Sequence, residues 1–65
     1  LSQREREVLV LIMRGRNVPA IAEELVLSRN TVQTHVRHIY EQLGVHSRQE
    51  LVAYVEGFSS QSSNA

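Results

Sequence analysis

The sequence predicts an all-α domain built from four helices. Apolar residues recur at helical spacing, capping residues and glycines mark the ends of the apolar segments, and no stretch alternates at the period of a strand. With 65 residues, of which 42% are hydrophobic, the chain has the size and composition of one small globular domain. We expect this domain to cover residues 1–57 and a disordered, serine-rich tail to cover residues 58–65.

A first helix is predicted from about Gln3 to Arg14, ending at Gly15. Ser2 and Glu5 have the spacing of a capping box, in which each side chain accepts a hydrogen bond from the other residue's backbone N–H. This structural role for Glu5 is preferred to a catalytic one, because nothing in the sequence supplies a pocket around it. The buried side of the helix is expected to consist of Val8, Leu9, Leu11 and Ile12.

A second, shorter helix is predicted from about Pro19 to Leu25. Proline is well tolerated in a first helical turn, because the N–H that it lacks would have no partner there. Ile21, Ala22 and Leu25 have the spacing of an inward-facing side.

The third helix is predicted to run from Arg29 to Leu43. Ser28 before it is a good N-cap, and Gly44 after it can adopt the left-handed conformation that ends a helix. One side of this helix forms an apolar stripe at helical period. The stripe consists of Val32, Val36, Ile39, Tyr40 and Leu43.

The opposite face of the third helix is polar. It carries Asn30, Gln33, Thr34, Arg37 and Glu41. Amide, hydroxyl and guanidinium groups of this kind suit hydrogen bonding to base edges and phosphates. Two helices with a tight connection, of which the second has such a face, form a helix-turn-helix. We therefore interpret the second and third helices as this motif and the third as its recognition helix.

A fourth helix is predicted from about Arg48 to Glu56, starting at a second capping-box pattern and ending at Gly57. Its uncharged run, residues 51–55, is broad for so short a helix. These residues could all pack beneath the first helix, but we favour a shared role, with one side in the core and the other in a homodimer contact. The residues expected at the dimer interface are Leu51, Val52, Tyr54 and Val55.

The formal net charge is zero, but the charges are unevenly distributed. Residues 28–48 contain three arginines and three histidines against one glutamate, whereas residues 1–27 are balanced. This is a modest basic patch, weaker than that of a strong DNA-binding protein. The neutral total is the best support for an alternative function, that of a protein-interaction module using the fourth helix as its docking surface.

Several functional classes find no support in the sequence. It has no cysteine, no glycine-rich phosphate loop and no arrangement of serine, histidine and acid, so we expect neither an enzyme nor a cofactor. His35 and His38 have a spacing that can bind zinc, with His46 beyond the helix, but no natural fourth ligand accompanies them. Phosphate contact or simple solvation is the preferred interpretation of these histidines.

No apolar run approaches the roughly 20 residues that span a membrane, and a cytoplasmic location is expected. Leu1 falls directly before the first helix cap. We therefore expect a regulatory domain, either a phosphoryl-accepting receiver or a ligand-binding domain, to precede this region in a longer protein.

Four short motifs occur in a specific order and spacing: Leu1-Ser2-x-Arg4-Glu5, Ile21-Ala22 followed by Leu25, Ser28-x-x-Thr31-Val32-x-x-His35, and Leu43-Gly44-Val45 followed by Ser47-Arg48. On these motifs the chain resembles the C-terminal DNA-binding domain of LuxR/FixJ-type bacterial transcription regulators, among them response regulators. The resemblance extends from Leu1 to about Val55.

The resemblance implies sequence-specific binding of double-stranded DNA, with the third helix in the major groove and Gln33, Thr34 and Arg37 close to the bases. It also implies a dimer contact through the fourth helix, and RNA polymerase is a further candidate partner. Phosphate contacts are expected from Arg29, Asn30, Thr31, His35, His38 and Arg48.

The chain departs from the family pattern at Gln33, where lysine is usual, and at residues 18–20, where a polar, often lysine-containing segment is usual. We expect Gln33 to shift base preference from guanine toward adenine, whose N6 and N7 pair with an amide. A second DNA-binding alternative, region 4 of a sigma factor, shares the three-helix core but is disfavoured by the fourth helix.

Overall fold

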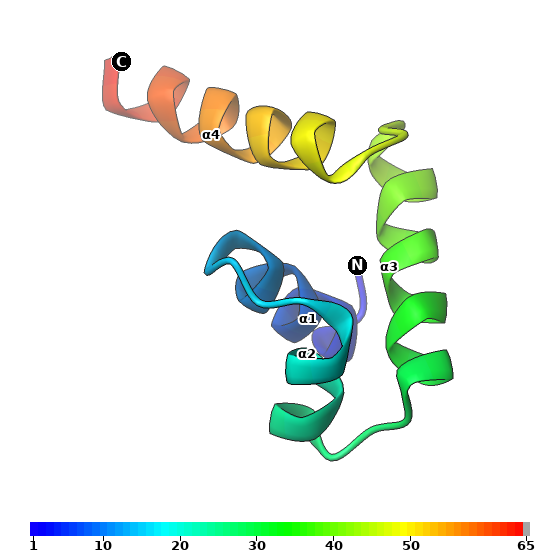
Figure 1. Cartoon of the computed structure of the whole chain (residues 1–65). Helices are drawn as coiled ribbons and strands as arrows, with labels where there is room; N and C mark the ends of the chain where they lie inside the picture. Colours follow the sequence, from blue (N-terminus) through cyan, green and yellow to red (C-terminus); the bar gives the residue numbers. More distant parts are fainter. Residues whose placement is uncertain (65) are drawn as a thin grey trace.

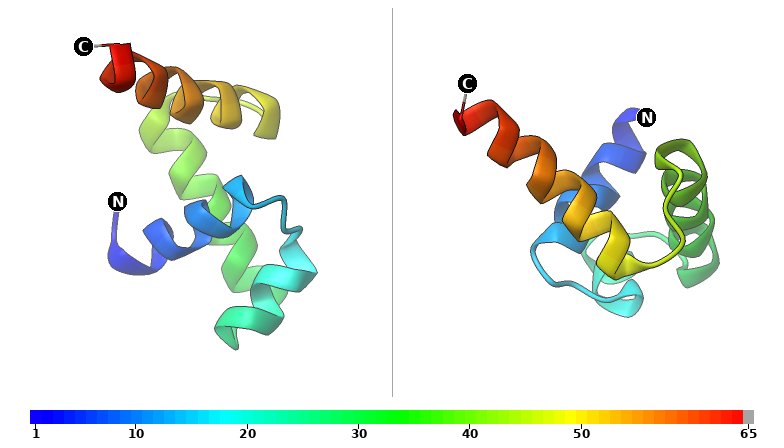
Figure 2. Two further views of the ribbon diagram at one scale, coloured as in Figure 1. Left: turned by 90° about the vertical axis from the view of Figure 1, so that its left-hand side faces the viewer. Right: turned by 90° about the horizontal axis from the view of Figure 1, so that it is seen from above.

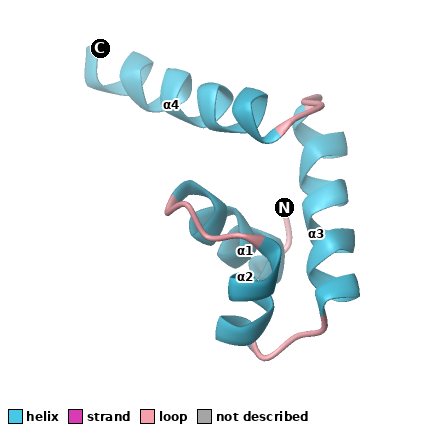
Figure 3. Cartoon of the chain, viewed as in Figure 1, coloured by secondary structure: helices cyan, strands magenta, loops and turns pink. Residues whose placement is uncertain are grey.

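A computed structural model describes the backbone of residues 1–64 and the side chains of residues 1–57. It contains helices α1 (Gln3–Met13), α2 (Val18–Leu25), α3 (Arg29–Leu43) and α4 (Arg48–Asn64) (Figure 1). The described backbone contains no strand (Figure 3). The all-α fold class is thereby confirmed, with α2 and α3 as the predicted helix-turn-helix.

Side chains cap the first three helices. The capping box of α1 is complete: the Ser2 and Glu5 backbone N–H groups donate to each other's side chains, both at 3.2 Å. Ser28 Oγ accepts from the Thr31 N–H at 3.1 Å, and Gly44 ends α3 with a φ of 68°, so both predicted ends of α3 are confirmed. The sequence reading missed the cap of α2, Asn17, whose Oδ1 accepts from the Ala20 N–H at 3.0 Å.

The predicted end of the fourth helix at Gly57 was wrong, because α4 continues to Asn64. Gly57 does not adopt the positive φ by which Gly15 and Gly44 close their helices. A glycine inside a helix costs about 1 kcal/mol relative to alanine but does not by itself end the helix. The helical backbone thus enters the segment expected to be a disordered tail, residues 58–65; residue 65 and the side chains of residues 58–64 lie outside the described part.

The core lies where α1, α2 and α3 converge, with α3 crossing the other two (Figure 2). Its buried apolar residues are Val8, Leu11, Ile12, Ile21, Ala22, Val32, Ile39, Val45 and Leu51. The inward sides predicted for the first three helices all contribute to this core. Their remaining members pack around the buried cluster as half-buried residues, namely Leu9, Leu25, Val36, Tyr40 and Leu43. Burial of one stripe of α3 leaves its opposite face exposed.

Helix α4 follows the short connection after α3 and extends away from the other three helices (Figure 1). Leu51 anchors it, with no exposed surface, and Val55 packs half-buried against the same cluster. Leu51 was predicted at a dimer interface, but the core of its own chain encloses it, so it is a packing residue. Val52, Val55 and Tyr54 remain as the apolar surface of that prediction, with Tyr54 43% exposed.

The turn between α2 and α3 contains the one non-glycine residue with positive φ in the described chain, Val26, at 56°. Its side chain is 88% exposed. A β-branched residue is poorly suited to the left-handed conformation. Because the Val26 side chain is exposed, its burial does not offset the cost of this conformation. The turn is therefore a locally strained connection within the helix-turn-helix.

Candidate nucleic-acid interface

The outward face of α3 carries most of the residues predicted to contact DNA. The exposed ones on this helix are Arg29, Asn30, Thr31, Gln33, Thr34, Arg37 and His38. Val32 and Ile39 on the other side of the helix are fully buried, which fixes the rotation of α3 about its axis. The fold thus holds a row of amide, hydroxyl and guanidinium groups toward solvent on a rigid helix.

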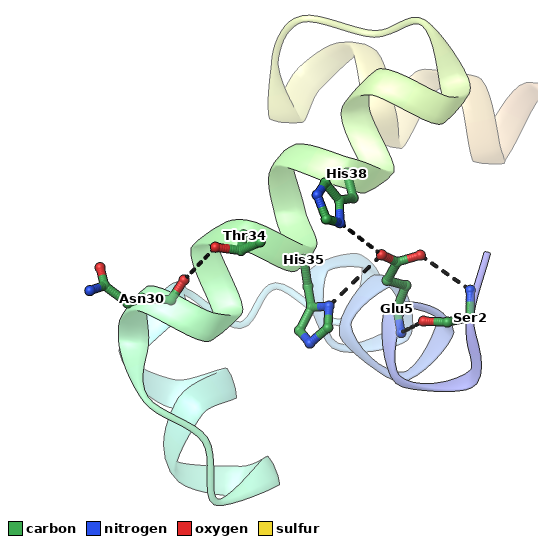
Figure 4. Close-up of polar contacts among 6 residues, drawn as sticks. All are labelled: Ser2, Glu5, Asn30, Thr34, His35 and His38. Atoms are coloured by element: carbon green, nitrogen blue, oxygen red, sulfur yellow. Dashed lines mark hydrogen bonds and ion pairs between the residues drawn. The ribbon is translucent and has the colours of Figure 1, made fainter.

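Thr34 has a defined hydrogen-bonding state. Its Oγ1 donates to the backbone oxygen of Asn30 at 3.0 Å, one turn earlier in α3 (Figure 4). The hydroxyl proton is therefore used within the helix, and the oxygen keeps its capacity to accept. A phosphate offers only acceptors, whereas base edges also offer amino donors and methyl groups. This arrangement favours a base over a phosphate as the partner of Thr34.

The start of α3 is built from Ser28 and Thr31. Their hydroxyl oxygens lie 2.9 Å apart and share a hydrogen bond, while Ser28 Oγ also accepts the Thr31 N–H. Arg29 lies exposed in the same turn. The helix dipole adds partial positive charge at this end, and the two effects together favour an anion such as a phosphate.

Glu5 connects α1 to the two histidines of α3, a contact that the sequence reading missed. The carboxylate is buried with 7% of the residue exposed, and its Oε2 lies 3.3 Å from His38 Nδ1 and 3.9 Å from His35 Nδ1 (Figure 4). The backbone bond from Ser2 is the main cause that lowers the pKa of Glu5, and the histidines lower it further, against the opposing effect of burial.

The two imidazoles differ in exposure. The His38 side chain is 52% exposed, whereas that of His35 is 22% exposed and its Nδ1 is buried without a hydrogen-bond partner. In both rings the second nitrogen lies on the side away from Glu5 (Figure 4). Both phosphate predictions thus depend on Nε2 alone, because Nδ1 faces the carboxylate.

Arg48 has an intramolecular role that the sequence reading also missed. Its Nη2 donates to the backbone oxygens of Ile12 at 3.0 Å and Arg16 at 2.6 Å. The guanidinium thereby satisfies carbonyls at the end of α1 and in the following turn, and joins the start of α4 to them. The other N–H groups of Arg48 remain for the predicted phosphate contact, which stays a prediction.

His46 takes part in the start of α4 through its backbone. Its N–H donates to Glu50 Oε2 at 2.7 Å, while the Glu50 N–H donates to Ser47 Oγ at 3.1 Å. Half of the predicted capping box is therefore present, because Ser47 Oγ accepts from the Glu50 N–H, whereas the Glu50 carboxylate accepts from the N–H of His46 and not from that of Ser47. No group of three or more potential metal ligands occurs among the described residues.

The long-range contacts were missed because they join residues far apart in the sequence. Glu5 and His38 are separated by 33 positions, and Arg48 and Ile12 by 36. Motif spacing reports neighbours within one or two helical turns and carries no signal for such pairs. The available indication was the helical spacing of Glu5 with Val8 and Ile12, which places the carboxylate on the buried side of its helix.

Comparison with known proteins defines the class of this chain. The family described as "Bacterial regulatory proteins, luxR family" matches residues 1–55. The chain therefore belongs to the LuxR family, whose members are DNA-binding transcription regulators and not a class of enzymes.

Among curated proteins, the chain is similar to the "Probable transcriptional regulatory protein NarL" of Mycobacterium tuberculosis, in two strains. The identity is 55% over 53 residues, which is 82% of this chain and 24% of the relative. The chain thus spans about a quarter of the length of these relatives. No solved structure gives a significant match.

None of the described helices is long and apolar enough to cross a membrane.

Proposed function

We propose that this chain binds double-stranded DNA sequence-specifically, with α3 in the major groove, as the output domain of a longer bacterial transcription regulator. The observation that carries the proposal is the row of exposed hydrogen-bonding side chains on one face of α3, opposite the buried Val32 and Ile39. A major groove about 12 Å wide admits an α-helix and displays a distinct pattern for each base pair. Its place of action is then the cytoplasm, where the bacterial chromosome lies.

The proposal gives α3 two kinds of contact. Gln33, Thr34 and Arg37 read bases, with Gln33 suited to adenine and Arg37 to guanine. Contacts to phosphates fix the register and orientation of the helix without reading sequence. The residues proposed for phosphate contact are Arg29, Asn30, Thr31, His35, His38 and Arg48.

A homodimer through α4 is the second part of the proposal. The residues proposed for the contact strip on α4 are Val52, Tyr54 and Val55, of which Tyr54 is 43% exposed and Val55 also packs half-buried against the core. Pairing of two such strips would present two α3 helices to half-sites about 10 bp apart. The zero net charge instead favours a protein-interaction module on the same strip, with RNA polymerase as one partner to test.

Selection from random duplex DNA tests the function directly. An enriched repeat, with log K falling linearly in log salt concentration, would establish specific binding and count the phosphates neutralised. If the chain binds all DNA sequences equally, or binds none, the proposal is contradicted. A protein-interaction module would then be the better function.

Arg37→Ala tests the base contact. We expect binding to the selected duplex to weaken by about 1–3 kcal/mol, with most of the preference for guanine lost at one position. Thermal unfolding should be unchanged, because Arg37 is exposed and forms no ion pair among the described side chains. Equal weakening on all duplexes would instead make Arg37 a phosphate contact.

A further inference from the structure

The Glu5 carboxylate has two oxygens with separate partners. Oε1 accepts the Ser2 N–H at 3.2 Å and completes the cap of α1, while Oε2 faces His38 Nδ1 at 3.3 Å and His35 Nδ1 at 3.9 Å on α3. The cap thus fixes the position of the second oxygen, which lies against the inner side of both rings (Figure 4). The proposed DNA interface therefore has an acidic group directly behind two of its phosphate-contacting residues.

Glu5 is the acid that pairs with these rings within 4.0 Å, among residues whose side chains are described. Neither α2 nor the described part of α4 supplies another, and neither does α3 itself. The remaining charged residues on these helices, none of which forms an ion pair with either ring, are Glu23, Glu24, Arg29, Arg37, Glu41, Arg48, Glu50 and Glu56.

An ionised carboxylate only accepts hydrogen bonds. His38 can bond to Glu5 only with the proton on Nδ1, and in a neutral ring Nε2 then carries a lone pair. A lone pair offers nothing to a phosphate oxygen. When the ring takes up a second proton, Nε2 becomes an N–H donor, and the positive ring lies between two anions, Glu5 and the phosphate.

We infer that Glu5 is a positioning residue of the DNA interface, which holds the ring of His38 with Nδ1 protonated. His38 then meets a phosphate only in its charged form, so DNA binding takes up a proton. This inference rests on the proposed DNA function. It makes DNA affinity dependent on pH through a residue of α1 that does not itself face the groove.

Glu5→Gln separates this role from the structural one. The glutamine oxygen still accepts the Ser2 N–H, because a capping box accepts Glu or Gln at this position. The amide then presents NH₂ to His38, so Nδ1 must accept and the neutral ring carries its proton on Nε2. The variant ring is therefore a phosphate donor without taking up a proton.

The measurement is the Kd of the selected duplex by fluorescence anisotropy at constant salt, from about pH 5.5 to about pH 8.5, across the ordinary histidine range. For the unaltered chain we expect Kd to rise by up to about tenfold per pH unit through the range where one linked proton is lost. For E5Q we expect a change below about twofold and, at the alkaline end, tighter binding than that of the unaltered chain.

Three control variants sharpen the experiment. E7Q removes the same charge from the same helix at a residue that pairs with Arg4, so it should keep the pH dependence. His46→Gln should also keep it, whereas His38→Gln should flatten it. Thermal unfolding at each pH confirms that every variant is folded.

Nitrogen-15 NMR of the free protein supplies a second readout, which does not need DNA. We expect the Nδ1–H tautomer at His38 in the unaltered chain and the Nε2–H tautomer in E5Q. Parallel pH profiles for the two proteins, or the same tautomer in both, would overturn the inference. Failure of the unaltered chain to bind any duplex would instead overturn the DNA function, while the tautomers would still decide the role of Glu5.

Discussion

The three-helix core and α4 are stabilised in different ways. In the core, α1, α2 and α3 each bury an apolar side against the other two, and side chains cap the start of all three. Helix α4 depends on one fully buried residue, Leu51, a half-buried Val55 and the hydrogen bonds of Arg48. A recognition helix needs a rigid support, whereas a helix with few attachments can change its position or its partner at lower cost.

Ile39→Ala should have the largest effect on stability. Ile39 is fully buried on the inner side of α3, and truncation of such a residue leaves a cavity and costs about 2–5 kcal/mol. We expect a single unfolding transition at lower denaturant concentration, measured by far-UV circular dichroism. Val10→Ala is the control, because Val10 is 47% exposed and its truncation should change little. Equal losses in the two variants would contradict the burial described.

Leu51→Ala should separate α4 from the core. Leu51 is as fully buried as Ile39, but it is the main apolar anchor of its helix. We expect a loss of about 2–3 kcal/mol, at the lower end for such truncations, because the remaining helices keep their own contacts. Hydrogen exchange should accelerate in residues 48–57 and much less in α3. Uniform acceleration along the chain would show that α4 and the core unfold as one unit.

Arg48→Ala should weaken the same attachment by a smaller amount. The side chain satisfies the Ile12 and Arg16 carbonyls, and loss of these charge-assisted hydrogen bonds should cost about 1–2 kcal/mol. Arg48→Lys should retain only part of the stability that Arg48→Ala loses, since an ammonium lacks the planar geometry of a guanidinium. Chemical denaturation compares the three proteins. Full recovery with lysine would mean that charge alone matters at this position.

Val26→Gly should have the smallest effect, in the opposite direction. It replaces a β-branched residue at a φ of 56°, where glycine avoids a penalty of about 1–2 kcal/mol but loses more entropy on folding. We expect the free energy of unfolding to increase by about 0.5–1 kcal/mol, which a higher thermal unfolding midpoint would show. Val26→Ala, which keeps a Cβ, is the control. A destabilised glycine variant would mean that the exposed valine has a partner in solution.

Local sequence determined the start of α1 and both ends of α3, because capping signals are local. Ser2 with Glu5 at the start of α1, and Ser28 and Gly44 at the two ends of α3, each act within one helical turn. Periodicity likewise selected Val32 and Ile39 as buried, and so placed Gln33 and Arg37 outside. The fold class and the polar face of the recognition helix were therefore predictable.

Only the tertiary structure decided how the helices meet. The same periodicity that marked Leu51 as apolar could not say whether the core or a second chain covers it. The sequence predicted that Glu5 caps the first helix but gave no sign of its contacts with His35 and His38. It predicted a phosphate contact for Arg48 but not the hydrogen bond from Arg48 to the end of α1. Contacts of this kind join residues 30 or more positions apart, and their geometry exists only after the helices have packed.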